Sequence, residues 1–150
     1  MEYGSGESVL SVSLTIRSAR MSPMTAEAVV LLVDDMFFTA KINAAAAECG
    51  RQIERVKSRE QLEGLVANPP SLAIIDLNSD RLDPLESIAF LKSSAQLSAV
   101  PIVSFVSHVQ TDLIRAAQAA GCDYVLPRSA FTQMIDEVVA GNLAALKPRT

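Results

Sequence analysis

The chain has 150 residues, of which 49% are hydrophobic and 20% are charged, a composition typical of a soluble globular protein and not of a disordered one. Its net charge of −4 argues against non-specific nucleic-acid binding, which needs a clustered basic surface, and no apolar run approaches the roughly 18 residues that span a bilayer. Cys49 and Cys122 are far apart in the sequence and are most simply two reduced thiols, so we expect a cytoplasmic protein. Together with the net charge and the short apolar runs, this leads us to expect no nucleic-acid or membrane partner.

Residues 1–25 differ from the rest of the chain. They are rich in serine and contain Gly4, Gly6 and Pro23, which predicts a flexible N-terminal tail before a domain at 26–150. Within the tail, VLSVSLTI (9–16) alternates apolar and polar side chains, as an edge strand does. An added strand and a partner-binding segment therefore remain open as alternatives to a flexible tail.

From residue 27 onward, patterns typical of strands and of helices alternate. VVLLV (29–33) is apolar throughout, which predicts a strand buried on both faces. Thr39 to Cys49 predicts a helix that ends at Gly50. Four further strands are predicted at 52–56, 72–76, 100–106 and 123–126.

Four more helices are predicted between and after these strands. They run from a cap at Ser58 to Ala67, from Asp83-Pro84 to about Ala95, from Thr111 to Ala120, and from Thr132 to about Leu146. Five strands alternating with five helices predict an α/β fold, a doubly wound five-stranded parallel sheet with helices on both faces and right-handed crossovers.

Acidic residues follow two of the predicted strands. Asp34 and Asp35 end the first strand, and Asp76 ends the third. Because the carboxyl ends of parallel strands meet at one edge, three carboxylates are expected to share a rim. Their repulsion requires protonation or a bound cation, and oxygen-only ligands suit Mg²⁺. A carboxylate beside Mg²⁺ can also act as a nucleophile toward phosphorus. Without a metal ion, replacing Asp34 or Asp35 by Asn is expected to relieve the repulsion and stabilise the fold.

Four segments in order, VVLLVDD, LAIIDLN, VPIVSFVSH and AGCDYVL, together resemble a response-regulator receiver domain of the CheY-like family. The resemblance covers roughly residues 27–147 and implies a (βα)5 flavodoxin-like, CheY-like three-layer sandwich in an atypical single-domain member. It implies that a histidine kinase or phosphotransfer protein donates a phosphoryl group to Asp76. It also implies an Mg²⁺ cofactor held by Asp35, Asp76 and the backbone carbonyl of Asn78, with Asp34 acting through a water molecule.

The chain departs from the family pattern after the third and fourth strands. The family's proline and glycine beyond the acceptor are replaced by Asp80 and Pro84. The family's serine or threonine at the end of the fourth strand falls on Val106 when counted from Pro101, and valine cannot hydrogen-bond through its side chain. Either an extra strand residue brings Ser107 to the phosphoryl group, or the hydroxyl is absent; adjacent strand residues point to opposite faces, so one position decides this. His108 follows as a loop histidine.

The end of the fifth strand is altered as well. The family lysine that pairs with the phosphoryl group falls on Arg128 when counted from Gly121, and on Pro127 when counted from Tyr124. Arginine keeps the positive charge but is a planar fork and not a compact ammonium. Tyr124 is either the family's switching aromatic or a core tyrosine. The resemblance further implies a downstream protein partner on the face of the fourth helix, fifth strand and last helix.

Three functions are consistent with these residues. The first is a phosphoacceptor that acts by reversible partner binding, a signalling protein that is at most an enzyme toward itself. The second is a degenerate receiver that binds partners without phosphate. The third, a small Mg²⁺-dependent phosphohydrolase, is disfavoured because no second aspartate follows two residues after Asp76.

Overall fold

The computed structural model describes residues 28–107 and 110–146, so the predicted tail at 1–25, its alternating segment and His108 lie outside the described residues. Five strands form one parallel sheet in the order β2-β1-β3-β4-β5. The strands are β1 (Ala28–Leu32), β2 (Gln52–Arg55), β3 (Leu72–Asp76), β4 (Ile102–Val106) and β5 (Tyr124–Pro127). This is the parallel α/β sheet that the sequence predicts.

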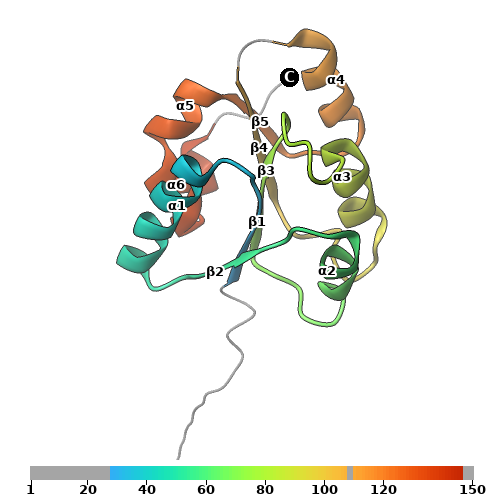
Figure 1. Cartoon of the computed structure of the whole chain (residues 1–150), viewed down its shortest axis with the longest axis horizontal. Coiled ribbons are helices and arrows are strands. Elements are labelled where there is room, and N and C mark those ends of the chain that lie inside the picture. The colour runs from blue at the N-terminus through green and yellow to red at the C-terminus, as the bar shows by residue number, and fades with distance from the viewer. Residues whose placement is uncertain (1–27, 108–109, 147–150) are drawn as a thin grey trace, which may run out of the picture.

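Helices cover both faces of the sheet, with α1, α5 and α6 on one face and α2, α3 and α4 on the other (Figure 1). Their bounds are α1 (Met36–Cys49), α2 (Arg59–Gly64), α3 (Pro84–Ser93), α4 (Thr111–Ala119), α5 (Arg128–Gln133) and α6 (Ile135–Ala140), followed by a 3-10 turn, η3 (Leu143–Ala145). Within the described residues, no helix has the length and apolar character needed to cross a membrane.

The inner strands are buried throughout and mostly apolar because each face of the sheet has its own core. In β1, Val29 and Leu31 pack with α1 and α6, whereas Val30 and Leu32 pack on the opposite side with α2 and α3. Successive strand side chains point to opposite faces, so burial on both faces removes the usual alternation of polar and apolar residues. The shorter edge strand β2 keeps an alternating exposed and half-buried pattern.

The predicted last helix, from Thr132 to about Leu146, is wrong in its start and its continuity. The chain turns directly from β5 into α5 at Arg128, and backbone dihedrals of φ −112° and ψ 13° at Met134 separate α5 from α6. Gly141, with φ 84°, ends α6 in the left-handed conformation that glycine adopts most easily. The earlier start brings Arg128 to the carboxyl edge of the sheet.

Two other helix ends differ from the prediction by three residues. Helix α1 begins at Met36 and not at Thr39, because the Asp35 side chain caps its first turn. Helix α2 ends at Gly64, before the predicted end at Ala67, and gives way to turns. The capping contacts at Ser58 and Asp83 form as the sequence predicts.

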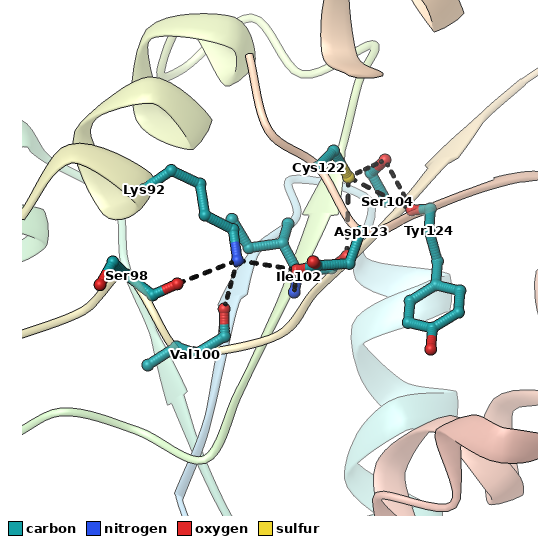
Figure 2. A network of polar contacts seen from close by, with 8 residues as sticks. All are labelled: Lys92, Ser98, Val100, Ile102, Ser104, Cys122, Asp123 and Tyr124. Atoms are coloured by element: carbon teal, nitrogen blue, oxygen red, sulfur yellow. Dashed lines mark hydrogen bonds and ion pairs between the residues drawn. The ribbon is translucent and has the colours of Figure 1, made fainter. Parts of the chain in front are cut away.

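A polar network joins α3 to the amino-terminal ends of β4 and β5 (Figure 2). Lys92 Nζ lies 2.8 Å from Asp123 Oδ2 and donates to the carbonyls of Val100 at 3.0 Å and Ser98 at 3.3 Å. Asp123 Oδ2 in turn accepts from the backbone N–H of Ile102 at 2.8 Å. The network therefore pairs the charges of Lys92 and Asp123 and also provides hydrogen-bond partners for backbone groups near the starts of the strands.

Gly121 makes room for the lysine in this network. Its φ is 108°, and a Cβ added there would lie 2.8 Å from Lys92 Cγ. A side chain at this position would meet both a strained backbone and a steric clash.

Candidate functional site: a carboxylate rim with two arginines

The strand register brings the acidic residues to one edge. Leu32 of β1 pairs with Ile75 of β3, so the segment after β1 runs beside Asp76, the last residue of β3. Asp76 itself pairs with Phe105 of β4. We call the group formed by Asp34, Asp35 and Asp76 the carboxylate rim.

Asp76 is the most buried member of the rim, with 8% of its surface exposed. Its Oδ1 accepts a hydrogen bond of 2.8 Å from the backbone N–H of Asn78. Burial raises the pKa of this carboxyl group, and the negative charges of Asp34 and Asp35 add to the rise, against the opposing effects of the Asn78 hydrogen bond and the Arg128 charge. The fold therefore disfavours a bare negative charge on Asp76.

Asp35 serves the fold and the rim together. Its Oδ1 caps α1 by accepting from the N–H groups of Phe37 at 2.8 Å and Phe38 at 3.3 Å, and its Oδ2 lies 2.6 Å from Arg128 Nη2. The guanidinium of Arg128 also lies over the Phe38 ring, 4.4 Å from its centroid. Burial acts to raise the pKa of Asp35, but the Arg128 and backbone hydrogen bonds outweigh it, so the pKa is lowered.

Asp34 pairs with a second arginine, Arg81, a contact that the sequence does not predict. Its Oδ2 accepts from Ser79 Oγ at 2.7 Å and from the backbone N–H of Arg81 at 3.2 Å, and its Oδ1 lies 3.3 Å from Arg81 Nε. Despite partial burial, these bonds lower the pKa of Asp34. The charged segment NSDRLDP (78–84) is the feature of the sequence that could have indicated this contact. Hydrophobic periodicity does not predict the conformation of such a loop, so the contact itself could not be derived.

These pairings overturn the premise that repulsion dominates at Asp34 and Asp35. Their lowered pKa values mean that the folded protein favours their charged forms, so replacing either by Asn is not expected to stabilise it. At Asp76, in contrast, desolvation and the repulsion from Asp34 and Asp35 outweigh the favourable contacts, so its pKa is raised.

The proposed phosphoryl-sensing residues occupy different environments. Val106 ends β4 opposite Pro127 and is 1% exposed, with its side chain packed in the core on the α2, α3 and α4 side. Ser107 follows at an exposed position and donates its backbone N–H to Asn78 Oδ1 at 2.8 Å. Arg128 reaches the rim through Asp35. Tyr124 begins β5, at the other end of that strand from Arg128, and packs against the core beneath α1 and α6.

The oxygen-only chemistry of the rim suits Mg²⁺, with Asp35, Asp76 and the Asn78 carbonyl as candidate ligands and Asp34 as a holder of metal-bound water. Guanidinium groups already neutralise Asp34 and Asp35. Across residues 28–107 and 110–146, no group of three acidic, histidine or cysteine side chains is arranged to hold a metal ion. A divalent cation would therefore compete with Arg81 and Arg128 for these oxygens.

No protein-family model and no curated protein matches the chain. Solved structures do match. The phosphorylated cyanobacterial phytochrome response regulator RcpA aligns with a TM-score of 0.65 at 20% identity, over 83% of this chain and 99% of that one. The chain has the receiver-domain fold. A putative response regulator from Chloroflexus aurantiacus gives a TM-score of 0.67 at 18% identity, over 79% of this chain and 98% of its own.

Chemotaxis response regulator CheY4 of Vibrio cholerae aligns with a TM-score of 0.65 at 16% identity, over 82% of this chain and 100% of that protein. The predicted CheY-like α/β architecture and the resemblance to receiver domains are thus confirmed at the level of the fold. At these identities the receiver-domain fold is shared by chains that differ at most positions, so the likeness extends to the fold alone.

Proposed function

We propose that this receiver-fold protein is a signalling module in which Asp76 accepts a phosphoryl group and so changes the binding of a protein partner. One observation carries the proposal. In the part of the chain that the structure describes, the carboxylates of Asp34 and Asp35 each hold an arginine, whereas the carboxylate of Asp76 accepts a single bond, from the Asn78 N–H. That bond occupies Oδ1 and orients the carboxylate, which leaves Oδ2 as the nucleophile.

The donor in this proposal is a phosphohistidine of a histidine kinase or phosphotransfer protein. As the bond between Asp76 Oδ2 and phosphorus forms, the N–P bond of the donor breaks and its electron pair stays on the imidazole. Bound Mg²⁺ would offset the charge of the carboxylates and of the phosphoryl oxygens. Arg128 supplies a fixed positive charge near Asp76, which would favour the phosphorylated state.

A small phosphodonor tests the proposal. Incubation with acetyl phosphate and Mg²⁺ is expected to add one phosphoryl group to the intact protein, measured by mass spectrometry. Asp76→Ala is expected to remove the gain, and Asp80→Ala, which changes a nearby exposed carboxylate, is expected to keep it. A gain that persists in Asp76→Ala would contradict the assignment, and continuous phosphate release without a stable adduct would indicate a hydrolase.

A degenerate receiver that binds partners without phosphate is the second candidate. It is favoured by the buried Val106 at the position where the family has a hydroxyl, and by the arginines that already neutralise Asp34 and Asp35. It predicts no mass gain with acetyl phosphate. It also predicts equal partner affinity with and without beryllofluoride, an unreactive phosphoryl mimic.

A further inference from the structure

Asn78 connects the buried carboxylate of the rim to the loop that leads into α4. Its backbone N–H donates to Asp76 Oδ1 at 2.8 Å. Its side-chain oxygen accepts from the Ser107 N–H at 2.8 Å, and its side-chain nitrogen donates to Gln110 Oε1 at 2.8 Å. One residue of the β3–α3 loop therefore holds Asp76 with its backbone and the two described ends of the β4–α4 loop with its side chain.

The element at the end of this chain of contacts is lightly anchored. Ala117 is the one fully buried residue of α4, whereas α3 buries Ser87, Ile88 and Leu91. The α4 N-cap position, Gln110, makes no side-chain capping bond. Helices that bury little apolar surface open and shift at low cost in free energy, so a hydrogen bond at the first turn matters more for α4 than for α3.

Gln110 connects the Asn78 side chain to the first turn of α4. Its carbonyl accepts from the Ile114 N–H at 2.9 Å in the first turn of α4, while its side chain is held by Asn78. A shift of Asn78 therefore reaches the backbone of α4 through one residue. The buried apolar side chain of Val106 offers no hydroxyl for a parallel route through β4.

We propose that Asn78 is a positioning residue that transmits the state of Asp76 to α4. A change at Asp76 Oδ1 removes or redirects the acceptor of the Asn78 N–H, which moves the peptide that carries the side chain bonded to Ser107 and Gln110. As a signalling device this deepens the proposed function and rests on it, because phosphorylation is the change that Asn78 would report.

Hydrogen exchange of the α4 amides tests the coupling without any phosphoryl group. Asp76→Ala removes the acceptor of the Asn78 N–H and is expected to speed exchange in α4 about fivefold, the effect of losing one hydrogen bond. In an Asn78→Ala background, where the side-chain contacts are already lost, Asp76→Ala is expected to cause no further change in α4. An equal effect in both backgrounds, or no effect in the wild type, would overturn the proposal.

Two further variants separate coupling from general damage. Gln110→Ala removes the acceptor of the Asn78 side-chain amide but keeps Asn78 Oδ1 for the Ser107 N–H, so it is expected to speed exchange in α4 while protecting Ser107. Asn68→Ala, at an exposed asparagine in the turn after α2, is expected to change neither. If Asn78→Ala speeds exchange equally in α3 and α4, the residue only stabilises the whole fold and the proposal fails.

Beryllofluoride with Mg²⁺ links the coupling to the signal. It is expected to alter exchange in α4 of the wild type and to leave α4 unchanged in Gln110→Ala while still binding, because Gln110 carries the contact to α4 and lies outside the candidate metal ligands. Binding with an undiminished α4 response in Gln110→Ala would overturn the coupling and leave the phosphoacceptor proposal standing. Failure of the wild type to bind the mimic would overturn the proposed function, while the coupling is decided by the Asp76→Ala experiment.

Discussion

The amino-terminal and carboxyl-terminal ends of the parallel strands differ in how their charged side chains are paired. At the amino-terminal edge, Lys92 meets Asp123, and both also bind backbone groups at the starts of β4 and β5. At the carboxyl-terminal edge, three carboxylates meet two arginines, so one negative charge remains uncompensated. The first arrangement is complete in itself and serves the fold. The second leaves a buried acid that the fold does not need, which is where we place the chemistry.

The largest effect that tests this contrast lies at Gly121, beside Lys92. Gly121→Ala is expected to lower the free energy of unfolding by about 2 kcal/mol, because the left-handed backbone and the contact with Lys92 both disfavour a Cβ. Gly64→Ala is the matched control, since nothing lies within 4 Å of an added Cβ there and alanine favours helices. Urea denaturation of both variants measures the difference, and equal midpoints would show that Lys92 moves aside freely.

Neutralising one aspartate at each edge should change stability in opposite directions. Asp123→Asn is expected to destabilise the protein by about 1 kcal/mol at neutral pH, because Lys92 loses its charged partner. Asp76→Asn is expected to stabilise it, because the raised pKa of Asp76 means that ionisation costs folding free energy.

The pH dependence follows from the same sign. A carboxyl group whose pKa is raised by folding contributes stability below its unfolded pKa and loses that contribution as the pH rises through the folded value. The gain from Asp76→Asn should therefore be full at neutral pH and shrink as the pH falls below the raised pKa of Asp76. Urea denaturation at several pH values measures it, and destabilisation by Asp76→Asn at neutral pH would place Asp76 with the structural charges.

The smallest expected effect concerns Arg81. Its contact with Asp34 is exposed, so Arg81→Ala should raise Mg²⁺ affinity by only about threefold, through loss of a weak competing ion pair. Calorimetric titration measures this, with Arg59→Ala as a control because Arg59 pairs with Glu63 on α2 at similar exposure. Unchanged affinity in Arg81→Ala would show that Arg81 does not compete with the metal.

The sequence predicts the sheet better than the loops. Continuous apolar runs such as 72–75 show which strands are buried on both faces. The acidic residues that follow these runs, Asp34, Asp35 and Asp76, are thereby placed at the strand ends without further information. The break at Met134 could not be predicted, because neither proline nor glycine marks it. The contacts of Arg81 and of the Asn78 side chain depend on loop conformation, which hydrophobic periodicity does not encode.

Three packed aromatic rings support the charged groups of the rim. Phe38, Phe105 and Phe131 are each at most 1% exposed, with ring centroids of neighbouring pairs 4.5 to 5.9 Å apart. Phe38 lies three residues after Asp35, Phe105 pairs with Asp76, and Phe131 lies three residues after Arg128. A substitution that changes the volume of any one ring would shift the carboxylates and the guanidinium of Arg128 together. Evolution can therefore change the electrostatics of the rim without replacing a charged residue.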